Sequence, residues 1–186
     1  ALTNNTTASE NTAVGYKAGY ANTTGVEIVA VGERALTTNT TGNYNTALGR
    51  VALFLNTTGA SNTAVGNNAL RSNTTANHNT GVGYQALYSN TTGYSNTALG
   101  SNGPLYANTT GNNNVAIGYN ALDTNTTASG NIAVGSNALT LNTTGGSNVA
   151  MGQQALNSNT TTSNSTAVGY QAGYSNTSGG VQAFGY

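Results

Sequence analysis

The sequence contains no cysteine, no tryptophan and one proline, and it is poor in charge. Without cysteine, the chain can form neither a disulfide framework nor a thiolate metal site. Charged side chains make up 4% of the 186 residues, against about 25% in an average soluble domain. Four basic residues balance four acidic ones, so the chain lacks the basic surface that nucleic-acid binding requires.

Long apolar segments and a recognisable leader are missing as well. No apolar run exceeds a few residues, so we expect no membrane-spanning helix. The chain begins at Ala1 rather than at methionine, and its first residues do not resemble a signal peptide. We therefore expect either a processed chain or a section of a longer one.

What the chain does contain is a repeat. A triplet of a small residue, an aliphatic residue and glycine returns at near-constant intervals, with its glycine at 15, 32, 49, 66, 83, 100, 118, 135, 152, 169 and 185. We number the repeat from the asparagine that lies two residues before the triplet. Its 17 positions then read N-T-A-V-G-Y-Q-A-L-Y-S-N-T-T-G-x-S. The whole chain is one domain: a half-coil over 1–10, ten coils over 11–180 and a half-coil over 181–186.

The distribution of charge indicates which repeat positions face water. The charged residues and the single histidine occur only at positions 6, 7, 10 and 17. Positions 3–5, 8, 9 and 12–14 never carry charge. Position 4 is apolar in every copy and position 9 is usually leucine, so we predict that both side chains point inward.

The period predicts an all-β fold, a parallel β-solenoid (β-roll) with about eleven 17-residue coils. Helical repeats need about 33 residues, and this composition disfavours helix. We expect a strand at positions 2–5, a second extended segment at positions 8–11, and a closing turn through N-T-T-G. Eleven coils at about 4.8 Å per strand make a rod about 50 Å long.

Two local features carry further expectations. The glycine at position 5 occurs in every copy, which indicates either a positive φ angle or a closely approaching backbone, and we favour crowding. One repeat is a residue longer than the others, and it contains the only proline, Pro104. We predict a bulge there, with proline placed where no ladder donor is needed.

The two ends of the chain complement each other. The first ten residues match positions 8–17 and the last six match positions 1–6. Uncapped solenoid ends expose sheet edges, so copies are expected to polymerise head to tail; the alternative is that both ends are cuts through a longer array. The expected assembly ends are Ala1, Leu2, Phe184, Gly185 and Tyr186.

The pentads "NVAIG" at 114–118 and "NIAVG" at 131–135 resemble the head repeats of trimeric autotransporter adhesins. The longer unit "NTGVGYQALYSNTTG" is similar to repeats of tail-fibre and surface-fibre proteins of phages, bacteria and large viruses. The resemblance implies a left-handed parallel β-roll, location outside the cell or on a virion surface, and fibrous work. It implies no receptor.

Asparagine at position 12 starts an N-x-[ST] sequon in every copy. One interpretation is a column of N-linked glycans; the other is a buried ladder of stacked amides that hydrogen-bond from coil to coil. The residues concerned are Asn5, Asn22, Asn39, Asn56, Asn73, Asn90, Asn108, Asn125, Asn142, Asn159 and Asn176.

Tyrosines gather at positions 6 and 10, which the charge pattern places at the surface. They are candidates for an interchain seam or a carbohydrate-binding face, and the alternative is stacking between neighbouring coils. They are Tyr16, Tyr20, Tyr84, Tyr88, Tyr106, Tyr119, Tyr170, Tyr174 and Tyr186.

Enzyme chemistry is not expected. His78 and Asp123 lie about three coils apart, so they cannot form a catalytic cluster. Glu10 and Glu27 occupy the same position of adjacent coils but are expected on a solvated turn. No cofactor or metal site is predicted. Ice binding is disfavoured, because the threonines at positions 13 and 14 are adjacent and adjacent strand residues point to opposite faces.

The expected function is that of an extracellular structural fibre protein that assembles by head-to-tail stacking and carries or binds carbohydrate. Its expected partners are copies of itself, as a homopolymer or a homotrimer. The alternative is the shaft of a phage tail fibre or of a trimeric adhesin that binds its host elsewhere.

Overall fold

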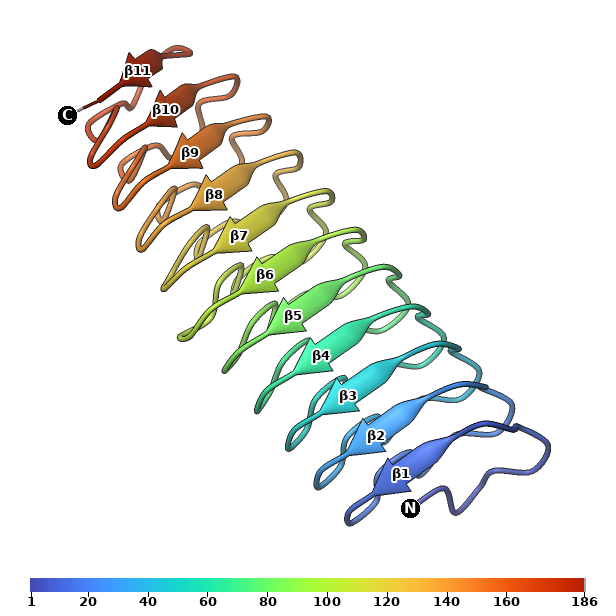
Figure 1. Ribbon diagram of the computed structural model, residues 1–186. Helices are drawn as coiled ribbons and strands as arrows, with labels where there is room; N and C mark the ends of the chain where they lie inside the picture. The colour runs from blue at the N-terminus through green and yellow to red at the C-terminus, as the bar shows by residue number, and fades with distance from the viewer. Residues whose placement is uncertain (186) are drawn as a thin grey trace.

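A computed structural model describes residues 1–185, and over these residues the chain is a β-solenoid without helices (Figure 1). One short strand per coil joins a single eleven-stranded parallel sheet in chain order. The strands are β1 (Thr12–Val14), β2 (Val29–Val31), β3 (Thr46–Leu48), β4 (Thr63–Val65), β5 (Thr80–Val82), β6 (Thr97–Leu99), β7 (Val115–Ile117), β8 (Ile132–Val134), β9 (Val149–Met151), β10 (Thr166–Val168) and β11 (Gln182–Phe184).

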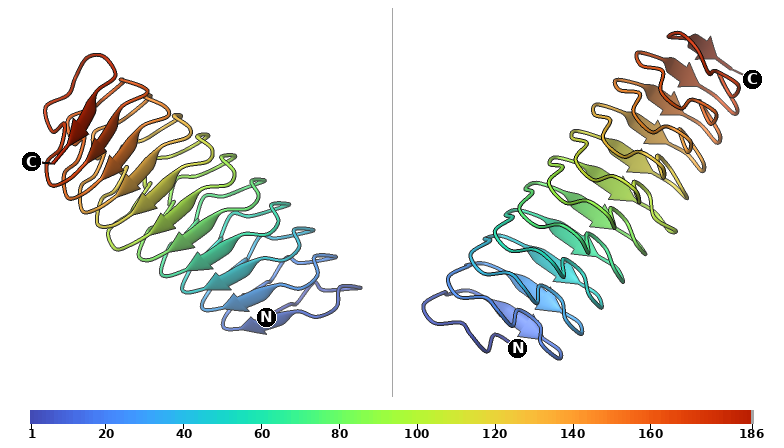
Figure 2. Two further views of the ribbon diagram at one scale, coloured as in Figure 1. Left: turned by 45° about the horizontal axis from the view of Figure 1, so that its top comes forward. Right: turned by 180° about the vertical axis from the view of Figure 1, so that it is seen from behind.

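The strands stack without any slip in register. Each residue of a strand lies opposite the residue at the same repeat position of the next coil, as Ala13 lies opposite Ala30. This register continues through the longer coil, where Ala98 lies opposite Ala116. The views in Figure 2 show the strands aligned along one side of the rod and the connecting turns along the other. The predicted β-solenoid, with one coil per sequence repeat, is confirmed.

Hydrogen bonds between coils extend beyond the sheet. The Leu36 N–H donates to the Ala52 carbonyl at 3.0 Å, which joins position 9 of one coil to position 8 of the next. In the turn, the Thr40 N–H donates to the Thr57 carbonyl at 2.9 Å. Neighbouring coils are therefore bonded to each other on both sides of the rod, which a chain with so thin a core requires.

The core consists of small residues. In the inner coils, the alanines at positions 3 and 8 and the leucines at position 9, such as Ala64, Ala69 and Leu70, have no exposed surface. The prediction for position 9 is thus confirmed, but the prediction that position 4 points inward is wrong: 59% of Val14 and 45% of Leu99 are exposed. Strand side chains alternate between faces, and the narrow interior accepts alanine at position 3 rather than the larger residue at position 4.

The second extended segment, predicted at positions 8–11, is absent from the described coils, where these positions form turns. Residues at positions 7 and 9 have left-handed backbones, with φ of 59° at Arg34 and 49° at Leu36. Two such residues within three reverse the chain direction. Position 9 therefore points its leucine inward from a turn rather than from a strand.

The position 5 glycine is required for both of the reasons considered. Gly32 has a φ of +133°, and a Cβ built on it would lie 2.6 Å from the carbonyl oxygen of Gly49 in the next coil. A side chain there would be strained and would also collide with backbone.

The longer coil accommodates its extra residue in the turn after β6, while β6 and β7 remain paired in register. Gly103 donates its N–H to the Tyr84 carbonyl at 3.1 Å, the bond that position 7 residues such as Gln85 make in other coils. Pro104 occupies position 8, and its carbonyl accepts the Leu87 N–H at 3.1 Å. In the preceding coil, the position 8 N–H of Ala86 bonds only within its own coil, to Gly83. Proline therefore removes no bond between coils.

Candidate functional site: two asparagine ladders and an exposed sheet face

The position 12 asparagines form a continuous ladder of side-chain amides along the rod. From Asn22 to Asn159, each amide nitrogen donates to the amide oxygen of the preceding coil, as Asn73 Nδ2 does to Asn56 Oδ1 at 2.8 Å. The same nitrogen also donates to the carbonyl three residues ahead, as Asn73 Nδ2 does to Ala76 at 3.1 Å. One amide therefore shapes its own turn and joins it to the turn before it.

Burial bears directly on the two interpretations of the sequons. From Asn22 to Asn159, the position 12 side chains have no exposed surface. A glycan attached at Nδ2 would replace a hydrogen that is already donated and would have no room. A sugar column is therefore incompatible with this packing. Asn5 and Asn176, in the first and last coils, are only partly buried.

A second ladder, which was not predicted from the sequence, runs through the position 1 asparagines. The Asn79 Oδ1 accepts the backbone N–H of Asn96 at 2.9 Å, and the Asn79 Nδ2 donates to the Gly93 carbonyl at 2.8 Å. That carbonyl also accepts Asn90 Nδ2 at 2.8 Å. The two ladders share acceptors, so the buried polar groups form one connected network.

The position 12 ladder stops before the last coil. Asn159 Oδ1 is the one buried side-chain polar atom of residues 1–185 without a hydrogen-bond partner. Asn176 Nδ2 points instead to Ser165 Oγ and to the Gly179 carbonyl, both at 3.4 Å. The last repeat is one residue short, so its turn departs from the others and leaves the Asn159 oxygen unpaired, at a cost in free energy.

The outward side of the sheet is an uncharged surface, called here the sheet face. It consists of the side chains at positions 2 and 4 of strands β1 to β11. Position 2 is threonine in six strands and valine, isoleucine or glutamine in the others, and position 4 is apolar throughout. Leu48, Met151 and Phe184 are 37%, 44% and 73% exposed. Exposed apolar surface of this continuity is unusual for a single soluble chain.

Two tyrosines of adjacent coils stack on each other within the chain. The rings of Tyr88 and Tyr106, at position 10 of adjacent coils, lie 5.0 Å apart and nearly parallel. Arg71 lies over the rings of Phe54 and Tyr88. These contacts correspond to the coil-to-coil stacking considered for the tyrosines.

The other tyrosines of residues 1–185 lie at the surface. Lys17 lies over both Tyr16 and Tyr20 at the first coil. Tyr186 lies outside the described residues. The carbohydrate-binding hypothesis stays a prediction, and it concerns the exposed rings of Tyr84, Tyr119, Tyr170 and Tyr174.

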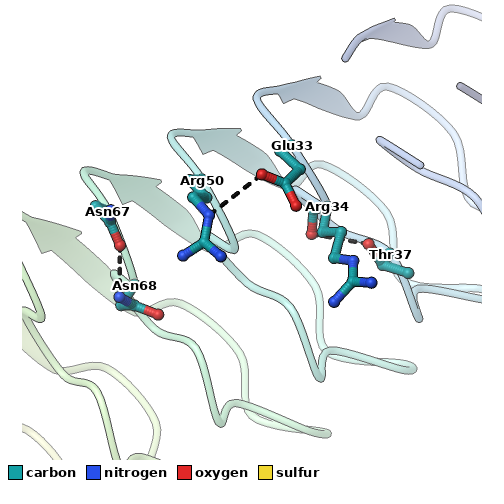
Figure 3. Close-up of polar contacts among 6 residues, drawn as sticks. All are labelled: Glu33, Arg34, Thr37, Arg50, Asn67 and Asn68. Atoms are coloured by element: carbon teal, nitrogen blue, oxygen red, sulfur yellow. Dashed lines mark hydrogen bonds and ion pairs between the residues drawn. The ribbon is translucent and has the colours of Figure 1, made fainter. Parts of the chain in front are cut away.

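No charged side chain lies on the sheet face, and those at positions 6 and 7 lie at the corner that follows the strand. In Figure 3, Glu33 and Arg50 project from position 6 of adjacent coils, and Arg50 Nε donates to Glu33 Oε2 at 3.2 Å. The next residue in this column is Asn67, and its partner is the neighbouring Asn68. About half of each charged side chain is exposed, so the pair contributes at most about 1 kcal/mol.

The remaining titratable residues do not come together. His78, Glu10 and Glu27 are exposed at position 17. Asp123 is partly buried, and desolvation raises the pKa of its carboxyl above the ordinary value. Within residues 1–185, no pocket and no group of three metal-ligating side chains is found.

Two further observations concern the surface and the membrane. Threonines at position 13 donate their hydroxyls to the next coil, as Thr57 Oγ1 does to the Thr74 carbonyl at 3.1 Å, whereas position 14 threonines such as Thr58 are exposed. These columns therefore do not present a paired hydroxyl array.

The described part of the chain contains no helix that is long and apolar enough to cross a membrane.

Comparisons with known proteins identified none that is similar to this chain. No family model, no curated protein and no solved structure matches it.

Proposed function

We propose that this protein is a structural fibre subunit, located outside the cell or on a virion surface, whose rods extend by stacking head to tail. The observation that carries the proposal is the ladder: backbone and asparagine bonds repeat from coil to coil along the rod axis. Such an arrangement resists extension and bending along the axis, and each added coil completes the bonds of the coil before it.

The first and last strands supply the contact surfaces. β1 and β11 each have one neighbour in the sheet, so each presents one unpaired strand edge. β11 of one rod would pair with β1 of the next in the register that all other strands share, which makes the contact heterologous and non-closing. The interior alanines Ala13 and Ala183, which are only partly buried, would become covered.

The last turn supports the same direction of growth. Asn159 Oδ1 lacks a partner in the single rod. A rod stacked on the last coil would bring Asn5 beside Asn176, and the ladder geometry of the inner coils would then favour a bond from Asn176 Nδ2 to Asn159 Oδ1. Stacking would thus remove the cost of a buried unpaired oxygen.

A second candidate is the shaft of a tail fibre or of a trimeric adhesin, which the resemblance of the "NVAIG" and "NIAVG" pentads favours. A shaft would separate a binding tip from an anchor and would have a defined length. The exposed tyrosines make carbohydrate the bound partner to test in either case.

Electron microscopy of the purified chain tests the proposal. We expect filaments much longer than about 50 Å with an axial repeat of about 4.8 Å in diffraction. Discrete rods of constant length at all concentrations would contradict head-to-tail stacking and favour the shaft.

A pair of variants identifies the contact. Ala13→Lys places an inward-pointing charge at the open end of β1, a device that blocks edge pairing, and should shorten the filaments at least tenfold. Val14→Lys adds the same charge to the same strand, but on the outward side, where Val14 is 59% exposed, and should leave filament length unchanged. Equal shortening by both variants would count against pairing through β1.

A further inference from the structure

We propose that the sheet face packs laterally against the sheet face of a second copy of this chain. The proposal rests on the fibre function above and adds a second direction of assembly. Axial stacking lengthens a rod through its ends, whereas lateral packing joins two rods along their sides.

Exposure of the sheet face is the first argument. Strand side chains at position 4 remain partly exposed: Leu48, Leu99 and Met151 are 37%, 45% and 44% exposed, while the alanines beside them at position 3 are completely buried. The most hydrophobic side chains of each strand therefore lie outside the core. A second apolar sheet would remove them from water.

The distribution of charge is the second argument. Every charged residue of the chain lies at position 6, 7, 10 or 17, and none lies at position 2 or 4. Two copies of the sheet face would therefore meet without repulsion between like charges and without desolvating an ion. The charged corners would lie at the rim of the contact, in water.

The size of the surface is the third argument. Eleven strands at about 4.8 Å give a length of about 50 Å, and two outward side chains per strand give a width of about 10 Å. The face then measures about 500 Å² per copy. Two copies would bury about 1,000 Å², which reaches the lower limit for specific interfaces.

The shape of the surface favours another copy over a rigid crystalline surface such as ice. Position 4 varies between valine, leucine, isoleucine, methionine and phenylalanine, so the face is uneven from strand to strand. Uneven rows at one common spacing can interdigitate with rows of the same spacing. Two such sheets pack about 10 Å apart with aligned strands.

The experiment measures the mass of the protein in solution by sedimentation. Every protein tested also carries the Ala13→Lys substitution, which suppresses axial growth. We expect twice the mass of the single chain, which is 18.6 kDa. Replacing Leu48, Leu99 and Met151 by lysine should weaken association at least tenfold and return the mass to 18.6 kDa. The control replaces Leu55, Leu141 and Thr92 by lysine; these residues are also exposed but lie outside the sheet, and association should persist.

Folding and the competing occupant are tested on the same samples. Circular dichroism should show the same β structure in all variants; if the lysine triple unfolds, Leu48→Thr, Leu99→Thr and Met151→Thr reduce the apolar surface with a residue that the face already contains. The proposal would be overturned if the mass stayed that of a single chain at every concentration. It would also be overturned if the control variant with three lysines lost association as strongly as the sheet-face variant. Thermal hysteresis of a single rod that the face variants abolish would assign the face to ice instead. The filament lengths expected for Ala13→Lys and Val14→Lys in the axial test do not depend on the outcome of this lateral test.

Discussion

A buried asparagine is tolerated in this protein because every coil supplies its neighbours with the missing partners. Asn90 donates to Asn73 Oδ1 and to the Gly93 carbonyl, and its oxygen accepts Asn108 Nδ2. Buried amides of this kind stabilise only when they are fully bonded, since an unpaired group costs about 1–3 kcal/mol. The ladder therefore favours the aligned register over any slipped one.

Asn90→Ala tests this role. It leaves Asn73 Oδ1 without its main donor and removes the acceptor of one Asn108 hydrogen. We expect the free energy of unfolding to fall by about 3 kcal/mol, measured by chemical denaturation. Thr92→Ala, in the same sequon but exposed, should change it by less than about 0.5 kcal/mol. Similar losses of unfolding free energy in both variants would show that the turn, rather than the Asn90 amide, determines the stability of the coil.

The half-buried carboxyl of Asp123, unlike the asparagine ladder, destabilises the folded chain slightly at neutral pH. Burial raises its pKa in the folded chain above the ordinary value of 3.8. Between the unfolded and folded pKa values the folded chain binds more protons, so the free energy of unfolding falls as pH rises through this window. Asp123→Asn should therefore raise the melting temperature at pH 7, and the gain should vanish below about pH 3.8. An equal gain at both pH values would contradict this explanation.

Each coil depends on the glycine that ends its strand. A methyl group on Gly32 would collide with Gly49 of the next coil, and its φ of +133° is strained for any other residue. We expect Gly32→Ala to lower the free energy of unfolding by more than about 2 kcal/mol. The break should be local, with faster amide exchange at Gly49, whose N–H donates to Val31.

Gly130→Asn is the matched control. Gly130 has a φ of +73°, and a Cβ added to it would lie 3.5 Å from its nearest neighbour, the Ser147 hydroxyl, which is ordinary contact. Asparagine already occupies the equivalent position 17 at Asn113 and Asn164, with φ of 56° and 60°. This variant should be neutral. Strong destabilisation by it would mean that backbone strain, not crowding, decides which glycines are needed.

At the scale of the coil, the sequence was sufficient to predict the repeat but not which way its strand faces. Periodicity and the positions of charge predicted the strand and an inward leucine at position 9, together with a second extended segment that the structure lacks. They could not separate position 3 from position 4, because neither carries charge. Side-chain size could have done so: position 3 is alanine or Gly81, as a narrow interior demands, whereas position 4 ranges from valine to Phe184.

The other differences have similar causes. Position 1 is asparagine in eight copies, and an uncharged polar residue repeated at that frequency is as good an indication of a ladder as position 12. Gly19 and Gly173 stand in place of leucine at position 9, which hints at the positive φ that excludes a second strand there. The unpaired oxygen of Asn159 depends on three-dimensional contacts and could not be predicted.

The whole molecule is held together with almost no help from charge. Its stability is the sum of contacts between adjacent coils, and these contacts are amide bonds and small apolar side chains. Raising sodium chloride from about 0.05 to 1 M should shift the melting temperature by less than about 3 °C. A larger fall would mean that surface ion pairs such as Glu33–Arg50 matter more than their exposure suggests, and Glu33→Gln would then reproduce it.

The longer coil, which contains Gly103 and Pro104, shows that the turn after the strand accepts additional length while β6 and β7 remain in register. A recognition peptide grafted between Asn102 and Gly103 would accordingly be displayed at one defined height on the rod. Grafts at the same corner of other coils would be separated by multiples of about 4.8 Å. The protein would then serve as a molecular ruler, with ligand spacing chosen by counting coils.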